Sequence, residues 1–218
     1  MDETWNSSDK FNREAAQWDE NKGRRALAHA VAEAIIAAAK PHNGMLALEF
    51  GCGTGLITME IAPHAGTVLA VDTSSAMLAV LDEKIRTSGV TSIVTTSIDI
   101  SSQQFTDSHE LSFDLIYSSM TLHHISDTAA FLNQLSTLLA PGGMIAIADL
   151  DREDGLFHDD PLEKLYHGFE RSELAAMIEA AGLQKTTFET AYIFDKQNRE
   201  GKITAYPVFL VTAQKPVS

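Results

Sequence analysis

The stretch Leu48-Glu49-Phe50-Gly51-Cys52-Gly53-Thr54-Gly55 decides the fold, because apolar residues give way there to three closely spaced glycines. The run from Met45 to Phe50 predicts a short buried strand, and the glycines predict a tight turn into a helix. Glycine has no Cβ, so a ligand can lie against the backbone of such a turn, facing the amides of the helix N-terminus. The stretch therefore predicts a strand, a ligand-binding turn and a helix in succession.

Outward from this turn, strand-like and helical segments alternate along the chain. We expect strands near residues 45–50, 67–71, 92–97, 113–117 and 144–150, and helices near 26–39, 54–63, 74–87, 127–139 and 171–181. Apolar strands that alternate with helices form a parallel sheet covered on both faces. Two β-rich runs, Thr186 to Phe194 and Ile203 to Thr212, predict a hairpin that adds an antiparallel strand at the sheet edge. The expected fold is α/β: a Rossmann-like three-layer sandwich with a mostly parallel, seven-stranded sheet.

Composition limits the classes of partner and compartment. The 218 residues, 44% of them apolar, suit one domain with a substantial core. A formal net charge of −14 repels phosphate backbones, so we expect no nucleic-acid partner. The lone cysteine, Cys52, cannot form an intrachain disulfide, which favours the cytoplasm. No apolar run is long enough to predict a membrane span, and the oligomeric state stays open.

An acid at the end of the next predicted strand makes the glycine turn more specific. Asp72 follows the turn by about twenty residues, where a carboxylate can accept both hydroxyl hydrogens of a ribose. A dinucleotide-binding turn would have its third glycine where Leu56 stands, so diphosphate binding and an NAD-dependent oxidoreductase are disfavoured. The alternative is a plain strand-to-helix connection in which Asp72 caps the helix. Turn and acid together favour a nucleoside ligand.

The motifs along the chain resemble those of a known enzyme family. Glu49 to Gly55 looks like the first motif of class I S-adenosylmethionine-dependent methyltransferases, and Val71-Asp72 resembles the second. Further matches to the family's motifs lie at Ile98 to Ile100, Phe113 to Ser118, Leu138 to Gly143 and Phe169 to Gly182. The pattern of Phe11 and Ala15 to Asp19 is similar to the small-molecule branch typified by ubiquinone and menaquinone biosynthesis methyltransferases.

The resemblance implies a site for S-adenosylmethionine and, after transfer, for S-adenosylhomocysteine. It divides the single domain into an N-terminal helical cap (1–43), a cofactor-binding core (44–150) and a substrate-side excursion with a helix and hairpin (151–218). Gly51 and Gly53 would contact the methionine part and Asp72 the ribose. The implied cofactor-binding residues are Glu49, Gly51, Cys52, Gly53, Gly55, Asp72, Thr73, Met77, Asp99, Ile100 and Ser118.

Three of these assignments have structural alternatives. The resemblance implies that Met77 packs on the adenine, although an ordinary core position explains it equally well. Asp99 would bind the adenine amine, or cap a turn. Ser118 would contact the amino-acid end of the cofactor, or cap a strand end. Cys52 is interpreted as a small filler residue of the turn, because no base for a reactive thiol is evident nearby.

Methyl transfer from a sulfonium is an in-line displacement, so it depends on positioning and needs a base only when the acceptor carries a proton. His123 and His124 follow the fourth predicted strand, and His123 is the candidate base, with a structural or pocket-shaping role as the alternative. Tyr117-Ser118-Ser119-Met120 stands where amino-methylating enzymes of nucleic acids and glutamine carry Asn-Pro-Pro and an aromatic. This departure favours a small-molecule acceptor. A cofactor-binding module without catalysis is the competing hypothesis.

Two remaining segments have open interpretations. Carboxylates and histidines occur after the fifth predicted strand without metal-ligand spacing, which favours a solvated loop and no metal site. The residues concerned are Asp149, Asp151, Glu153, Asp154, His158, Asp159, Asp160 and His167. Near the N-terminus, Phe11 and Trp18 either form a lid over the cofactor or pack at an edge of the domain.

Overall fold

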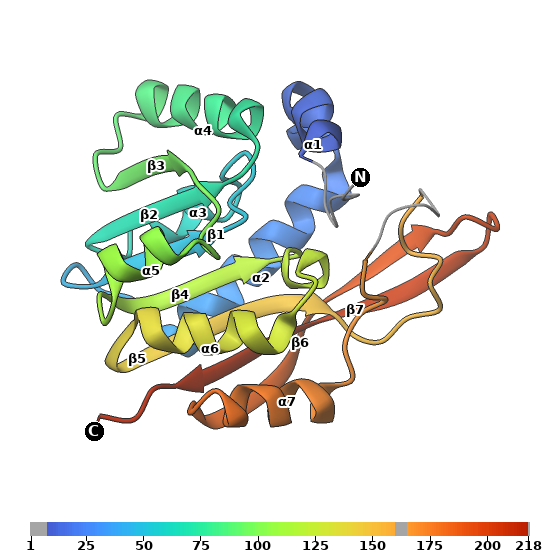
Figure 1. Cartoon of the computed structure of the whole chain (residues 1–218). Coiled ribbons are helices and arrows are strands. Elements are labelled where there is room, and N and C mark those ends of the chain that lie inside the picture. Colours follow the sequence, from blue (N-terminus) through green and yellow to red (C-terminus); the bar gives the residue numbers. More distant parts are fainter. Residues whose placement is uncertain (1–7, 160–164, 218) are drawn as a thin grey trace, which may run out of the picture.

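The computed structural model describes residues 8–159 and 165–217 (Figure 1). Its centre is a seven-stranded sheet of order β3-β2-β1-β4-β5-β7-β6. The strands are β1 (Leu46–Phe50), β2 (Thr67–Asp72), β3 (Ile93–Ser97), β4 (Phe113–Ser119), β5 (Leu139–Leu150), β6 (Gln184–Gln197) and β7 (Ile203–Gln214). The helices are α1 (Asp9–Glu14), η1 (Ala15–Glu20), α2 (Lys22–Ala39), α3 (Thr58–Ile61), α4 (Ser75–Ser88), α5 (Gln103–His109), η2 (Leu122–His124), α6 (Thr128–Leu138) and α7 (Arg171–Ala180).

The sheet confirms the expected fold class. Strands β1 to β5 pair in parallel, whereas β7 pairs antiparallel with both β5 and β6. The antiparallel strand therefore lies one position in from the edge, and β6 forms the edge itself. Burial explains this order: Val208 to Val211 of β7 are at most 1% exposed, whereas every residue of β6 is half-buried or exposed.

Two apolar layers place helices on both faces of the sheet. On one face, α2, α3 and α4 contribute Val31, Ile61 and Leu81 to a buried cluster. On the other face, α5, α6 and α7 bury Phe105, Leu135 and their neighbours (Figure 1). The N-terminal elements α1 and η1 pack against α4. No helix in the described part of the chain combines the length and apolar character that a membrane crossing needs.

Local differences from the sequence-based expectations have physical causes. The helix expected over 54–63 shortens to α3, because the glycine turn continues to Ile57. Helix α5 was not predicted, since it buries only Phe105 and so shows no amphipathic period. The hydroxyl of Ser102 accepts a hydrogen bond from the Phe105 amide at 3.3 Å and starts this helix. The remaining predicted helices and strands lie within a few residues of their expected positions.

Candidate active site

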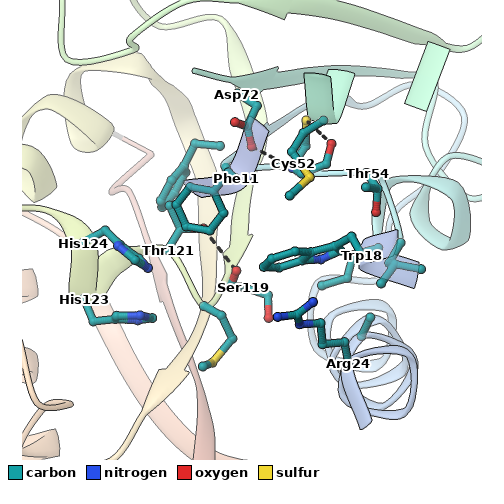
Figure 2. Close-up of a pocket in the computed structure, with 18 of the residues that line it drawn as sticks. Phe11, Trp18, Arg24, Cys52, Thr54, Asp72, Ser119, Thr121, His123 and His124 are labelled. Carbon is teal, nitrogen blue, oxygen red and sulfur yellow. Dashed lines mark hydrogen bonds between the residues drawn. The ribbon is translucent and has the colours of Figure 1, made fainter. Parts of the chain in front are cut away.

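A cavity of about 630 Å³ opens at the carboxyl ends of β1, β2 and β4 (Figure 2). Ligands of open α/β sheets bind in this position. Ten of the expected site residues line the cavity: Glu49, Gly51, Cys52, Gly53, Asp72, Thr73, Met77, Asp99, Ile100 and His123. The fold thus brings together residues that are widely separated in the sequence.

The glycine turn takes a backbone conformation that side chains disfavour. Gly51, Gly53 and Gly55 have φ values of +66°, +54° and +78°. A Cβ on Gly51 would overlap the side chain of Thr121, whereas a Cβ on Gly53 would have nothing within 4 Å. Glycine allows this left-handed turn and keeps the backbone open to a ligand at Gly53.

Asp72 holds the turn in place from the end of β2. Its Oδ2 accepts the Gly53 amide at 2.8 Å, and its Oδ1 accepts the Ser74 amide at 2.8 Å. Burial raises the pKa of this carboxyl, and the hydrogen bonds with backbone amides oppose that rise. Each oxygen keeps a further lone pair, so the carboxylate can still accept hydroxyl hydrogens from a ribose. Asp72 thus organises the turn and remains available to a ligand.

At the adenine end of the expected site, Met77 and Asp99 each have the structural role and also the place in the cavity wall that the sequence left as alternatives. Met77 is 1% exposed and lines the cavity, so it is both a core residue and a wall of the site. Asp99 is exposed and lines the cavity, and its Oδ1 also accepts the Ser101 amide at 2.8 Å. Ile98 and Ile100 flank it in the lining. This end offers an apolar slot with one carboxylate at its rim.

Two expected cofactor contacts lie outside the cavity lining. The hydroxyl of Ser118 is fully buried and donates to the Phe50 carbonyl at 2.8 Å, so it joins two strands. Successive strand residues face opposite sides, and Ser119 lines the cavity instead. A Cβ on Gly55 would overlap Leu81, so this glycine lets α4 pack on the turn. Both residues therefore have structural roles, and neither belongs to the cavity lining, in contrast to the expectation.

His123 lies at the opposite end of the cavity, in η2. Its Nδ1 is 2.7 Å from Asp149 Oδ1, and its backbone amide donates to Asp149 Oδ2 at 3.1 Å. Its Nε2 is buried and makes no hydrogen bond with the described residues. Asp149 is 0% exposed within β5, so its expected place in a solvated loop is wrong. Asp160 of that loop lies outside the described residues.

Two further histidines surround His123. The rings of His124 and His158 lie 4.2 Å and 4.9 Å from the His123 ring, centroid to centroid. Desolvation, followed by the neighbouring His123, lowers the pKa of His124 to about 2 and that of His158 to about 3. Both imidazoles are therefore neutral near pH 7. Within residues 8–159 and 165–217, no group of three histidine, cysteine or acidic residues is placed to hold a metal ion.

Comparison with known proteins shows similarity to methyltransferases. A sequence profile of the methyltransferase domain matches residues 48–145, from the glycine turn to β5. The chain is 29% identical over 147 residues to the ubiquinone biosynthesis O-methyltransferase of Methylococcus capsulatus, covering 66% of the chain and 61% of that protein. Residues 48–145 thus match a methyltransferase domain, and the chain is similar to class I S-adenosylmethionine-dependent methyltransferases.

Other proteins similar to this chain carry different names. It is 34% identical over 137 residues to an uncharacterized methyltransferase of Schizosaccharomyces pombe, covering 58% of the chain and 48% of that protein. It therefore spans about half to three fifths of these relatives' lengths. A methyltransferase structure from Aquifex aeolicus aligns with a TM-score of 0.67 and 19% identity, covering 96% of the chain and 98% of that chain. The structure of the [4+2]-cyclase SpnF aligns with a TM-score of 0.70 and 15% sequence identity, and the alignment covers 86% of this chain and 80% of SpnF. These structural likenesses show the fold.

The N-terminal segment of the chain contributes to the wall of the cavity. Phe11 and Trp18 lie edge to face with ring centroids 5.8 Å apart, and both line the cavity (Figure 2). The guanidinium of Arg24 lies 3.6 Å from the Trp18 ring centroid. Asn12 Oδ1 accepts the Ser74 hydroxyl at 2.7 Å, which ties the segment to the loop after Asp72. The position fits the lid interpretation of this segment.

Glu49 is the buried acid beneath the glycine turn. It is 2% exposed, and its Oε2 accepts the Thr58 hydroxyl at 2.6 Å. Desolvation raises the pKa of its carboxyl to about 8, so it is mostly protonated near pH 7. Burial also raises the pKa of the neighbouring Cys52 thiol, which agrees with a filler role for that residue.

Sequence reasoning missed Asp149, Ser119 and Arg24 as residues of the site. Asp149 was counted among the loop acids, although it lies at the end of the strand predicted over 144–150, because aspartate is seldom fully buried. Ser119 could have been found from the period of two in β4. Arg24 stands in a helical stretch with no motif of a binding site, and only the structure places it in the cavity lining, over the Trp18 ring.

Proposed function

We propose that this chain transfers the methyl group of S-adenosylmethionine to a small-molecule acceptor by in-line displacement. One observation supports this most: a single cavity has the glycine turn and Asp72 at one end and the buried Nε2 of His123 at the other. A nucleoside-binding end and a proton-accepting end within one chamber suit the transfer of a group between two bound molecules.

The residues present fit the cofactor. The backbone at Gly51 and Gly53 leaves room for the methionine part, the free lone pairs of Asp72 suit the ribose, and Met77 and Asp99 suit the adenine. When bound, the cofactor supplies a methyl group on a positively charged sulfur. The protein positions the acceptor and excludes water, and such positioning lowers barriers by up to roughly 10 kcal/mol in ideal cases. No covalent residue is needed.

The lining supports an acceptor of small size. Apart from the cofactor end, aromatic side chains from four separate segments line the chamber: Phe11, Trp18, Phe157 and Phe194. Aromatic walls suit a compact apolar molecule with few polar groups. The net charge of −14 opposes a nucleic-acid acceptor. The relative from Methylococcus capsulatus is named an O-methyltransferase, which supports an oxygen acceptor here.

We assign His123 as the base that accepts the acceptor's proton. Its Nε2 is buried without a hydrogen-bond partner among the described residues, as is Nδ1 of His124, but the His123 ring also contacts a carboxylate through its other nitrogen. Buried polar atoms are nearly always paired, so a bare nitrogen in a cavity indicates a group that binds a ligand's proton. A neutral imidazole is a suitable general base near pH 7.

A cofactor-binding module without methyl transfer is the second candidate, because the same fold occurs in a protein named a [4+2]-cyclase. Calorimetric titration with S-adenosylhomocysteine and with NAD separates cofactor classes, and we expect only the former to bind. Incubation with labelled S-adenosylmethionine and a metabolite extract should then yield a labelled small molecule. Binding without any labelled product would favour the module, and binding of NAD alone would overturn the proposal.

A further inference from the structure

Asp149 is surrounded by hydrogen-bond donors. Its Oδ1 accepts the Leu150 amide at 2.7 Å and lies 2.7 Å from His123 Nδ1, and its Oδ2 accepts the His123 amide at 3.1 Å. An ionised carboxylate only accepts hydrogen bonds, and two of these three partners are backbone amides that can only donate. The geometry therefore assigns the imidazole proton to Nδ1 of His123.

This assignment fixes the other ring nitrogen. A neutral imidazole carries one N–H, so a proton on Nδ1 leaves Nε2 with a free lone pair. His123 is 1% exposed, and its Nε2 is the ring atom without a partner in the described chain. Asp149 holds the ring at Nδ1, and the His123 backbone is fixed by its amide on Asp149 and by the Tyr166 amide, which donates to the His123 carbonyl at 3.0 Å. The lone pair is thus presented to the cavity in one fixed orientation.

We propose that Asp149 is a positioning residue that holds His123 in the Nδ1–H tautomer, so that the site selects acceptors with a hydroxyl proton to lose. The inference rests on the proposed methyl transfer. In the step, the acceptor O–H bond breaks and its proton bonds to Nε2. The oxygen forms a bond with the methyl carbon, and the electron pair of the broken carbon–sulfur bond stays on sulfur. His123 then releases the proton to solvent.

The groups around His123 are compatible with this role. His124 of η2 and His158 of the segment after β5 contact the His123 ring. Lys10 of α1, Lys196 of β6 and His167 act electrostatically on His158. The lowered pKa values of His124 and His158 keep both rings uncharged near pH 7. Asp149 is therefore the acidic side chain in direct hydrogen-bond contact with the His123 ring.

Nitrogen NMR of the histidine rings tests the tautomer without any acceptor. In the full chain saturated with S-adenosylhomocysteine, we expect His123 to show a protonated Nδ1 and an unprotonated Nε2. In Asp149→Asn, whose amide can donate, we expect part or all of the proton to move to Nε2. A wild-type chain with the proton on Nε2 would overturn the proposal even if the variant does not fold, and so would an unchanged tautomer in a folded variant.

Kinetics with paired probes test the consequence for catalysis. We expect Asp149→Asn to lower kcat for a phenol by about 10²- to 10⁴-fold and to alter the acid limb of the pH–rate profile, with KM changed by less than about threefold. Methylation of a matched aniline, which needs no base before attack, should change far less. An equal loss for both probes would contradict the inference.

Asp151→Asn is the matched control, because Asp151 lies two residues further on and pairs with Arg171 at 2.7 Å, away from His123. It should keep the wild-type tautomer and pH profile. Failure of the proposed function would appear differently, as no binding of S-adenosylhomocysteine or no methylated probe in the wild-type chain. The ring tautomer would still decide the role of Asp149.

Discussion

The backbone amide of Gly53 donates a 2.8 Å hydrogen bond to Asp72 Oδ2, which ties the turn after β1 to the end of β2. A second amide, that of Ser74, occupies Oδ1 at the same distance. The carboxylate thus shapes the glycine turn through contacts within the chain itself. Cofactor affinity and the order of the glycine turn should therefore respond together when Asp72 is changed.

Replacement of Asp72 tests this coupling. We expect Asp72→Ala to weaken S-adenosylhomocysteine binding by about 1 to 3 kcal/mol, because hydrogen bonds to a charged group are lost. The free energy of unfolding should also fall, since two buried amides lose their acceptor. Calorimetry and urea denaturation measure the two effects. An unchanged affinity would refute the ribose assignment, even if the variant is less stable.

Glu49 should make the protein less stable as the pH rises above neutrality. Its pKa is about 8 in the folded chain and near 4.5 when exposed. Between these values the folded chain keeps a proton that the unfolded chain has released, so the free energy of unfolding falls with pH by up to about 1.4 kcal/mol per unit. Denaturation at a series of pH values from 6.5 to 8 measures this slope.

Glu49→Gln is the control for this slope, because glutamine keeps a neutral group that can accept the Thr58 hydroxyl hydrogen. Its stability should vary less over the same pH range. His29 also has a raised pKa, through its contact with Glu60, and this contribution is common to both chains. The difference between the two curves therefore isolates Glu49. Parallel curves would show that its carboxyl is ionised in the folded chain.

The neutral histidines should limit stability on the acid side. His124 has a pKa of about 2 in the folded chain, against 6.5 when exposed. Below pH 6.5, His124 binds a proton in the unfolded chain but not in the folded chain, so the free energy of unfolding decreases as the pH falls. In His124→Gln, the free energy of unfolding should decline less between pH 6.5 and 5. An identical decline would assign the acid sensitivity to other groups.

A pair of glycines separates backbone strain from packing. Gly55 and Gly89 have similar φ values, +78° and +71°, but a Cβ would overlap Leu81 only at Gly55 and would meet nothing within 4 Å at Gly89. We expect Gly89→Ala to cost about 1 kcal/mol from strain alone. Gly55→Ala should cost about 1 to 3 kcal/mol more through overpacking. Equal losses in thermal or urea unfolding would show that Leu81 can move aside.

The N-terminal segment should slow release of the cofactor. Asp19 accepts the Thr54 hydroxyl at 2.6 Å and pairs with Lys84 at 2.5 Å, which fastens the segment to the glycine turn and α4. Asp19→Ala should raise the dissociation rate of S-adenosylhomocysteine by roughly 3- to 10-fold, corresponding to one or two partly exposed hydrogen bonds. Stopped-flow measurement of tryptophan fluorescence follows release, with the exposed neighbour variant Glu20→Ala as control. Equal rates would identify the segment as edge packing.

The sequence by itself determined the order of strands and helices, the glycine turn and the acid that faces it. These features are local: apolar runs define the strands, and the positive φ of the turn requires glycine whatever surrounds it. The spacing from Gly51 to Asp72 therefore sufficed to indicate a nucleoside site, and the family motifs sufficed to indicate the methyl donor. Short helix α5 escaped this reasoning because its packing involves a single buried residue.

Only the tertiary structure decided which polar residues face the cavity. Ser118 and Ser119 are adjacent and chemically identical, yet strand alternation and the crossing to Phe50 bury one and turn the other toward the ligand. Asp149 and His123 are 26 residues apart, and their contact depends on β4 and β5 being neighbours in the sheet. Such contacts depend on strand order and on the exclusion of water. Both are properties of the whole fold, so they cannot be predicted from neighbouring residues in the sequence.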